Sequence, residues 1–423
     1  MAAINTAIAL PLFKEVYGDS VENLVPEAAR LQKDAKFVSR DKQEGNKYHQ
    51  PVRTTRSHGW TLSTSGDAFP LNAAEPARTA DAQVQGSSFV LREVISYDAA
   101  AKLLSGKSEG ARKRAFVSGS AYMIETMTET AAFVLETQLL YGQTDVGLVE
   151  ARTAGVGTTS QTFSFTVGTF IPALWSGMEN GYVEVWNAAG AVKRNLSGTM
   201  QVTGVNVDAR TVTFVGTAAE MDAIVPTDKI YLRDTKSAGM VGLRTIISNT
   251  GLLFAVNAAN ASLWAGNTFD AAGGALSFVK VLQGLNKPVN RGLMKDVIGY
   301  CSPKSWSDCM NDLAALRRYS EKAGGSIEQG AESIKFYGQS GTIEIFPHIL
   351  VKPSEAMFFP KGGLIRLGAS ELTFTPPGMQ DKDFFENLPD HAGYGIRNYW
   401  NQALFCPTPA QCLLISGIVN SDD

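Results

Sequence analysis

Metal-binding side chains are scarce and widely spaced in this sequence. A structural zinc site usually brings two of its ligands within about two to four residues of each other. The closest cysteines, Cys406 and Cys412, and the closest histidines, His49 and His58, are farther apart than that. The other candidate ligands are Cys301, Cys309, His348 and His391. We therefore expect buried thiols and surface imidazoles, with no metal site and no cofactor.

A group of carboxylates near the C-terminus could form a catalytic acid pair or a cation site. The group consists of Asp381, Asp383, Glu386 and Asp390. Paired carboxylates act as general acid and base only where the environment raises the pKa of one of them. Lys382 lies within this segment, which is typical of a solvated loop. The sequence also has no phosphate-binding glycine loop, HExxH or GxSxG motif, so we expect no catalytic residue.

Basic residues crowd the start of an expected helix. They are Lys102, Lys107, Arg112, Lys113 and Arg114. Cations at a helix N-terminus interact unfavourably with the helix dipole. A solvated face would explain the cluster. The alternative is that Arg112, Lys113 and Arg114 face an acidic partner, such as nucleic-acid phosphates, a scaffold protein or a neighbouring subunit.

Composition excludes several classes of protein. The 423 residues are 44% hydrophobic and 19% charged, which predicts two or three globular units. The net charge of −3 argues against a protein that grips nucleic acid tightly. The mean hydropathy is −0.05, and no apolar run approaches the roughly 20 residues of a membrane span. Four cysteines do not make a disulfide framework and fit synthesis in a reducing cytoplasm.

Residues 47–98 predict a projecting hairpin. Strand-like runs at Tyr48–Arg53 and Phe89–Tyr97 flank a long polar stretch. A loop of this length without a core is usually disordered or functional, and a two-stranded ribbon is marginal by itself. We therefore predict that the hairpin packs on another chain. The candidate interface residues are Trp60, Phe69, Arg53 and Arg56, and the alternative for the two aromatic rings is a small cluster within the loop.

Two further segments before residue 150 predict helices. Residues 1–46 predict a helical arm that Gly18 and Pro26 divide into two short helices. Apolar spacing predicts a longer helix from about residue 108 to residue 141, with Gly142 as its C-cap. Such a helix would run roughly 50 Å, against an expected radius of gyration of about 22 Å. It would cross the whole subunit.

Residues 151–242 change to a β pattern. Five short strands are predicted at Thr162–Val167, Tyr182–Trp186, Met200–Val205, Thr211–Val215 and Lys229–Arg233. Strands at this spacing indicate a small barrel or sandwich inserted into a larger fold.

The rest of the chain mixes helices and strands. A buried strand is expected at Asp296–Cys301, followed by Ser302 as the N-cap of a helix that begins at Pro303. Further strands are predicted at Thr342–Phe346, His348–Val351, Gly363–Leu367 and Cys412–Val419. Interleaved helices and strands of this kind favour an α+β fold.

The order of these segments resembles the major capsid proteins of tailed bacteriophages, which share the Hong Kong 97-like fold. Residues 47–98 look like the E-loop, the helix within 99–150 like the spine helix of the P-domain, and 151–242 like an insertion domain. Val241–Ile246 followed by Asn260–Trp264 is similar to the connector. Residues 243–285 resemble P-domain strands with this connector, and 286–423 resembles the A-domain and C-terminal strands. Within the A-domain the resemblance covers Asp296–Tyr319, Ile343–Pro347 and Gly363–Arg366.

The resemblance implies a coat protein rather than an enzyme. Pentamers and hexamers of such proteins close an icosahedral shell around double-stranded DNA, which the near-neutral chain would contact weakly. It implies a place in the virion capsid after assembly in the host cytoplasm. A separate scaffolding protein and a portal would be partners, and the resemblance also allows a decoration protein; no membrane is involved. Some members join the E-loop covalently to a neighbour through a lysine, but this chain has none between Lys47 and Lys102.

Two other functions remain open. The first is an encapsulin-like container, which would enclose protein cargo instead of DNA. The second is an enzyme in which residues 151–242 form a carbohydrate-binding module. That enzyme would need a pocket with two carboxylates, one of them with a raised pKa.

Overall fold

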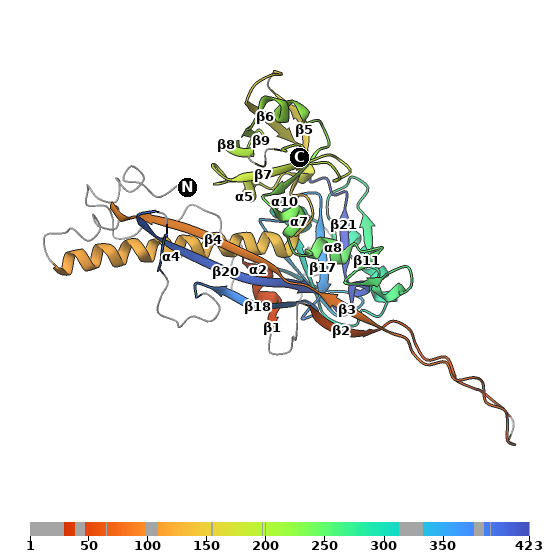
Figure 1. Cartoon of the computed structure of the whole chain (residues 1–423). Helices are drawn as coiled ribbons and strands as arrows, with labels where there is room; N and C mark the ends of the chain where they lie inside the picture. The colour runs from red at the N-terminus through yellow and green to blue at the C-terminus, as the bar shows by residue number, and fades with distance from the viewer. Residues whose placement is uncertain are drawn as a thin grey trace, which may run out of the picture.

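The computed structural model describes residues 29–38, 47–64, 66–98, 109–153, 155–196, 198, 200–312, 333–375, 385–389 and 391–422. Figure 1 shows a body built on two sheets, a β-barrel above it, and a thin ribbon that projects away from the body. Of the arm expected over residues 1–46, the segments 1–28 and 39–46 lie outside the described residues.

The first body sheet has six strands in the order β13 (Thr268–Asp270), β21 (Leu413–Ser416), β17 (Ala356–Pro360), β14 (Val297–Cys301), β16 (Thr342–Pro347) and β15 (Ile334–Tyr337). All residues of β14 are buried, because the strand has a partner on each side. The helix α9 (Phe278–Asn290) contacts β21 of this sheet, and α10 (Pro303–Asn311) contacts β16.

The start of α10 confirms the predicted cap. The Ser302 hydroxyl accepts a hydrogen bond from the Ser305 amide at 3.2 Å, and Pro303 occupies the first turn. The strand expected at His348–Val351 is wrong. The segment is a turn in which the Val351 amide donates to the His348 carbonyl at 3.1 Å. The expected surface imidazole is also wrong at His348, which is 3% exposed.

The second body sheet has five strands. Its path is β1 (Lys36–Val38), β18 (Ile365–Thr373), β20 (Gly393–Phe405) and β19 (Phe385–Asn387), and β4 (Ser87–Ser96) also pairs with β20. The long helix α4 (Glu109–Leu140) runs beside β20 and β18 of this sheet (Figure 1). Gly142 then adopts φ +54°, and a Cβ there would lie 2.1 Å from the Met240 carbonyl oxygen. Only glycine fits this position, which turns the chain from α4 into the barrel.

The barrel is closed by six strands in the order β10 (Lys229–Leu232), β5 (Gly147–Arg152), β6 (Ser160–Phe165), β9 (Thr211–Val215), β8 (Met200–Asn206) and β7 (Tyr182–Trp186). The sequence predicted five of these strands and missed β5, so the barrel begins before residue 151. Its interior holds fully or almost fully buried aromatic rings from Phe163, Phe165, Phe170, Trp175 and Phe214. A backbone bridge between Gly142 and Val241 joins the two ends of the inserted segment.

The remaining elements are short. They are α2 (Arg30–Asp34), β2 (Tyr48–Arg53), β3 (Thr79–Val84), η2 (Val167–Thr169), α5 (Pro172–Trp175), α6 (Ala218–Ala223), α7 (Thr235–Ala238), α8 (Leu243–Ile247), β11 (Leu252–Leu253), β12 (Val256–Asn257), η3 (Ser262–Trp264) and η5 (Pro409–Gln411). Within the described part of the chain, no helix has the length and apolarity that a bilayer crossing requires.

Candidate interaction surface

The projecting ribbon is made by β2 and β3. The strand predicted at Tyr48–Arg53 is confirmed as β2, but its partner is β3 and not the second predicted strand. Tyr48 pairs with Val84 and Arg53 with Thr79 in an antiparallel register. The strand predicted at Phe89–Tyr97 instead belongs to β4, which pairs with β20 in the body. The ribbon thus ends at residue 84, and the chain returns from it directly into the body sheet.

The base of the ribbon is fixed to the body. Ala82 and Val84 are buried, and the Gln83 amide donates to the Phe254 carbonyl at 2.9 Å. The Tyr48 ring meets Phe405 edge-on, with centroids 6.3 Å apart. This end of the ribbon therefore has a defined direction relative to the body.

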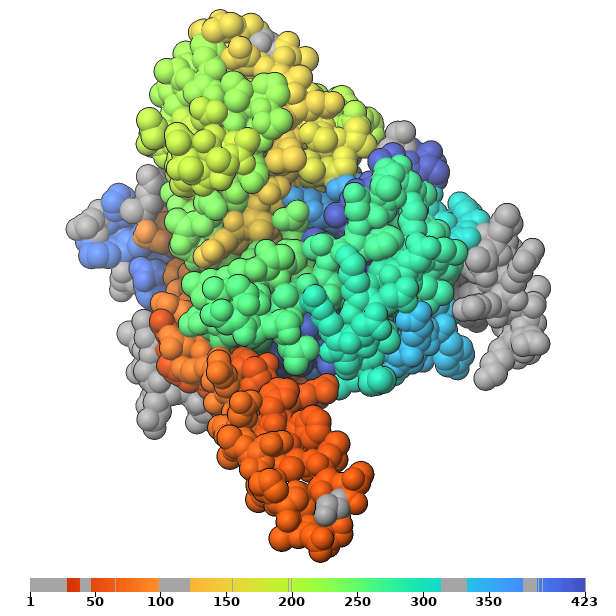
Figure 2. All heavy atoms as spheres, turned by 90° about the vertical axis from the view of Figure 1, so that its right-hand side faces the viewer, coloured from red at the N-terminus to blue at the C-terminus, as the bar shows by residue number. Residues whose placement is uncertain are grey.

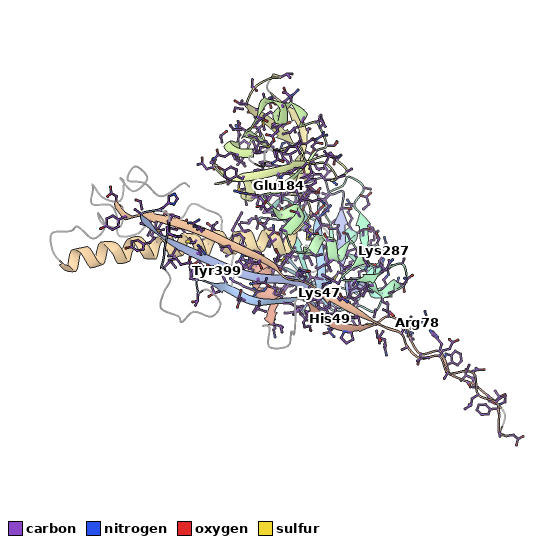
Figure 3. All side chains as sticks on the ribbon, viewed as in Figure 1. Lys47, His49, Arg78, Glu184, Lys287 and Tyr399 are labelled. Atoms are coloured by element: carbon purple, nitrogen blue, oxygen red, sulfur yellow. The ribbon has the colours of Figure 1, made fainter. Side chains whose placement is uncertain are left out.

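Beyond β2 and β3, the two chains of the ribbon continue side by side with few hydrogen bonds. The Thr54 amide donates to the Arg78 carbonyl at 2.9 Å, and the His58 amide donates to the Glu75 carbonyl at 3.0 Å. Farther out, the Asn72 side-chain amide donates to the Trp60 carbonyl at 3.2 Å. The ribbon makes these contacts with itself while it extends away from the body (Figures 1 and 3).

Large apolar side chains of the ribbon are exposed. The exposed fractions are 64% for Trp60, 82% for Leu62, 42% for Phe69 and 80% for Leu71. If Trp60 and Phe69 formed a small cluster within the loop, both rings would be buried, but Trp60 is not buried. Contiguous exposed apolar surface is typical of a protein interaction site. The exposure therefore favours the predicted contact with another chain.

The two arginines predicted for the interface lie nearer the body. Arg53 ends β2 and is exposed, and Arg56 is exposed just beyond it. The structure therefore separates the four predicted residues into an aromatic group on the outer ribbon and a basic group at its base.

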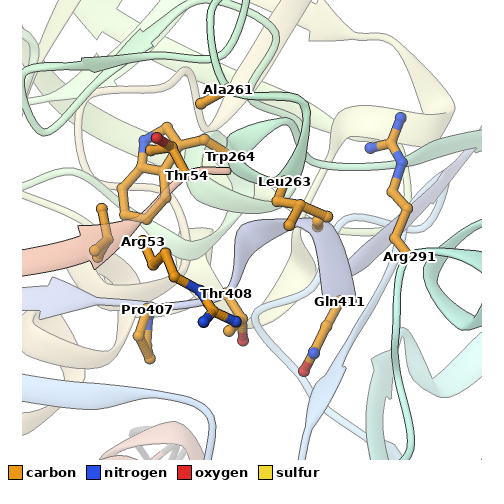
Figure 4. A pocket seen from close by; sticks show the side chains of 11 residues that line it. Arg53, Thr54, Ala261, Leu263, Trp264, Arg291, Pro407, Thr408 and Gln411 are labelled. Carbon is orange, nitrogen blue, oxygen red and sulfur yellow. The ribbon is translucent and has the colours of Figure 1, made fainter. Parts of the chain in front are cut away.

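A cavity of about 320 Å³ opens at the base of the ribbon. Figure 4 shows that Arg53 and Thr54 face it from the ribbon, Leu263 and Trp264 from η3, and Thr408 and Gln411 from the segment around η5. Pro407 and Ala261 complete its apolar walls. Sequence reasoning missed this cavity because its walls come from segments far apart in the chain.

The other predicted residues are placed as follows. Arg112, Lys113 and Arg114 lie in the first part of α4, where the backbone is described and the side chains are not. Asp381, Asp383 and Asp390 lie outside the described residues. Glu386 forms an ion pair with Arg397 at 2.9 Å.

Buried titratable groups hold the described part of the arm on the body. Glu136 of α4 accepts hydrogen bonds from the Leu31 and Gln32 amides at 2.6 and 3.1 Å. The Leu350 amide donates to His348 Nδ1 at 3.2 Å, so His348 Nε2 carries the proton and donates to Glu136 at 2.9 Å. The Glu136 carboxylate thus accepts hydrogen bonds from two amides at the start of α2 and from the His348 imidazole. Their role is structural.

A second buried group joins the barrel entrance to the body. Lys352 is 1% exposed, and its Nζ lies 2.6 Å from Asp145 Oδ2. Burial alone would raise the pKa of the Asp145 carboxyl. The charge of Lys352 and its hydrogen bond lower this pKa by a larger amount, so the pKa lies below its ordinary value. The Tyr141 hydroxyl accepts a hydrogen bond from the Lys352 amide at 2.8 Å, and burial raises the pKa of this tyrosine well above its usual range.

The four cysteines and Glu93 are further titratable groups with a shifted pKa among the described residues. All four cysteines are free and buried, which confirms the predicted buried thiols, and burial raises the pKa of Cys301 and Cys309. No group of three or more metal-binding side chains occurs among the described residues. Burial also raises the pKa of Glu93, but its neighbour across the sheet is Ile396 rather than a second carboxylate.

Comparison with known proteins gives structural matches only. No family model matches the chain, and no curated protein matches its sequence. A chain of the Cyanophage A-1(L) capsid asymmetric unit matches with a TM-score of 0.56 and 10% identity, over 98% of this chain and 99% of that one. The capsid of a native GTA particle gives a TM-score of 0.49 and 9% identity, over 99% and 100% of the two chains. The holo-SrpI encapsulin complex from Synechococcus elongatus gives 0.40 and 9%, over 99% and 96%.

Proposed function

We propose, because this chain has the fold of a tailed-phage major capsid protein, that it is a coat protein and that many copies of it assemble into a closed shell. The enzyme reading has no comparable support.

The exposed ribbon is the observation that carries this proposal. The barrel packs a cluster of fully or almost fully buried aromatic rings in its interior, whereas the ribbon leaves Trp60, Leu62 and Leu71 mostly exposed. Each buried Å² of apolar surface contributes about 25 cal/mol, and aromatic side chains dominate the energetics of interfaces. A neighbouring copy that covers the ribbon would supply the contacts that the single chain lacks.

Each segment then has a role in the shell. Residues 1–46 would be the arm, 47–98 the E-loop that holds the ribbon, and 99–150 the P-domain with α4 as its spine helix. The barrel would be the insertion domain predicted at 151–242, with β5 added to it. Residues 243–285 would form P-domain strands and the connector, and 286–423 would form the A-domain and C-terminal strands.

The proposal includes specific partners. Copies would associate as pentamers and hexamers around double-stranded DNA, which a chain of net charge −3 contacts weakly. Arg112, Lys113 and Arg114 would face an acidic partner, either the DNA or a scaffolding protein. A portal and a decoration protein would complete the virion capsid after assembly in the host cytoplasm.

Sedimentation velocity of the purified chain, with negative-stain images of each fraction, tests the proposal. Closed particles of uniform size are expected, made alone or with a co-expressed scaffolding protein, and nuclease-protected DNA should copurify from infected cells. Particles that contain protein cargo and no DNA would replace the phage function with that of a cargo container. A chain that remains monomeric under all these conditions would overturn the proposal.

A further inference from the structure

Two of the four cysteines lie at the two ends of one short loop. Cys406 directly follows β20 and Cys412 directly precedes β21, so the loop between them connects the two body sheets. Both side chains are 0% exposed, and their Sγ atoms are 3.7 Å apart. The sulfur atoms of a disulfide are about 2.05 Å apart. The two thiols are thus in contact, and small rotations of both side chains would bring them to bonding distance.

The backbone of this loop is held in place from both sides. Its sequence, Cys-Pro-Thr-Pro-Ala-Gln-Cys, contains two prolines, which restrict its conformations. The Gln411 amide donates to the Thr408 carbonyl at 3.0 Å. Asn267 donates from Nδ2 to the Ala410 and Cys412 carbonyls, at 2.7 Å each. A bond between the two sulfur atoms therefore needs no change in the path of the chain.

The two thiols differ in reactivity. The pKa of Cys406 lies below its ordinary value, because hydrogen bonds from Cys412 and from the backbone and side chain of Thr408 favour its thiolate in spite of burial. The pKa of Cys412 lies well above its ordinary value, because of its hydrogen bond to Cys406 and its burial. The thiolate is the form that attacks a disulfide. Cys406 is therefore the nucleophile of the pair.

Cys301 and Cys309 do not share this arrangement. Cys301 Sγ donates to the Phe346 carbonyl at 3.8 Å, and Cys309 Sγ donates to the Leu276 carbonyl at 3.7 Å. Burial raises the pKa of both thiols. These two cysteines have separate acceptors and little thiolate, so they serve as an internal control.

The loop also forms part of the wall of the cavity at the base of the ribbon. Pro407, Thr408, Ala410 and Gln411 line this cavity. The cavity lies on the side of the molecule that Figure 2 shows, where the base of the ribbon meets the green segment that carries η3. A small oxidant that enters the cavity therefore meets the outer side of the loop that carries both thiols.

We propose that Cys406 and Cys412 form an intrachain disulfide when the folded chain meets a small organic disulfide. The Cys406 thiolate attacks one sulfur of the oxidant, forms a mixed disulfide and releases one small thiolate. Cys412 then loses its proton and attacks the Cys406 sulfur, which expels the second small thiolate. The two cysteines lose two electrons and two protons, and the oxidant is reduced to two small thiols. The new bond joins the end of β20 to the start of β21.

This inference concerns the single chain and does not rest on the proposed function. Mass spectrometry of the oxidised wild type tests it. The reduced chain is incubated under native conditions with bis(2-hydroxyethyl) disulfide, quenched in acid, unfolded, treated with N-ethylmaleimide and digested with trypsin. Residues 398–423 contain Cys406 and Cys412 and no lysine or arginine, so both cysteines lie in one peptide. That peptide should be about 2 Da lighter than its reduced form and carry no maleimide.

The other two cysteines report on specificity in the same digest. Lys304 lies between Cys301 and Cys309, so trypsin places them in different peptides. Both peptides should be fully labelled by maleimide. The double variant Cys301→Ala/Cys309→Ala is the matched control, and its 398–423 peptide should lose the same mass as that of the wild type.

Single variants separate the two steps of the reaction. Cys412→Ala should stop at a mixed disulfide on Cys406. Cys406→Ala should react at least about tenfold more slowly, because the remaining Cys412 thiol has a raised pKa. Circular dichroism verifies that each variant folds, and the wild-type peptide result does not depend on the variants.

The cross-link should also stabilise the subunit. It restricts the unfolded chain, so the unfolding equilibrium constant should fall about tenfold or more on oxidation and return with dithiothreitol. Urea unfolding of the two forms measures this, and an equal urea midpoint would overturn the stabilising role. Maleimide on both Cys406 and Cys412 after incubation of the wild type with the oxidant would overturn the disulfide itself. A mixed disulfide that persists on wild-type Cys406 would do the same, and neither result bears on the shell.

Discussion

The barrel and the ribbon are built from similar short antiparallel strands but bury their side chains differently. The barrel closes six strands and encloses Phe163, Phe165 and Phe214, which are 0% exposed. The ribbon pairs only β2 with β3 and leaves Trp60 64% exposed. A closed barrel has no free edge and has an interior, whereas a two-stranded ribbon has neither.

This difference indicates where each region obtains its stability. The barrel packs its aromatic rings on one another, so its stability is internal to the subunit. The outer ribbon packs few side chains on the body, so it gains stability when a neighbouring copy covers it. The following predictions test this distinction, from the largest expected effect on the free subunit to the smallest.

The largest effect is expected in the barrel core. The Phe214 ring lies 5.7 Å from Phe163 and 6.3 Å from Trp175, measured between centroids. Phe214→Ala should lower the free energy of unfolding by about 3–5 kcal/mol through lost burial and the cavity that remains. Urea unfolding of the free subunit measures this. Phe69→Ala is the matched control and should change the value by less than about 0.5 kcal/mol. Equal losses in the two variants would show that the ribbon packs on its own subunit.

The next effect concerns the attachment of the barrel to the body. Lys352→Met leaves the Asp145 carboxylate without its partner and should cost about 3 kcal/mol of unfolding free energy. The double variant Lys352→Met/Asp145→Asn should recover most of that loss. No recovery would mean that Lys352 stabilises the junction through packing rather than charge.

The same ion pair gives a pH dependence. The pKa of Asp145 is lower in the folded chain than its ordinary value of 3.8, because of Lys352. The contribution of the Asp145 carboxylate to the free energy of unfolding is therefore complete above pH 3.8. It is lost as the pH falls through the lower pKa that Asp145 has in the folded chain. Urea midpoints of the wild type should fall more steeply below pH 3.8 than those of the double variant. Parallel curves would contradict this assignment.

The smallest effect on the free subunit is expected for the outer ribbon. Leu71→Ala should leave the free energy of unfolding within about 0.5 kcal/mol of the wild type. It should still raise the concentration needed for assembly, because Leu71 becomes buried only against a neighbour. Leu252→Ala on β11 is the matched control, since Leu252 is 73% exposed and Leu71 is 80% exposed. If both leucines change assembly equally, the effect is not specific to the ribbon.

Several elements could be predicted because their signals are local. The bounds of β7 and β9 agree with the predicted runs Tyr182–Trp186 and Thr211–Val215, in which apolar and polar residues alternate. The helix N-cap at Ser302 could be predicted because a serine directly precedes a proline in the sequence. The helix α9 was missed although Ser277 caps it, and Pro288 within it obscures the pattern.

Other elements had no local signal. The sequence Thr-Ala-Asp-Ala-Gln-Val of β3 contains few residues that favour strands, and it is a strand because β2 pairs with it. His348 was expected at the surface, but Glu136, from a distant part of the chain, accepts a hydrogen bond from its ring and allows its burial.

The sequence by itself determined the longest helix, five of the six barrel strands, the order of the segments and the presence of an exposed hairpin, because these depend on residues within one or two turns or strands. Tertiary structure decided which strands pair and which charges meet. Residues 87–96 could have continued the ribbon, but they pair with β20 at the other end of the chain. The basic cavity at the ribbon base likewise combines β2, η3 and the segment around η5. Pairing of this kind depends on how distant apolar faces are buried together, which no local pattern encodes.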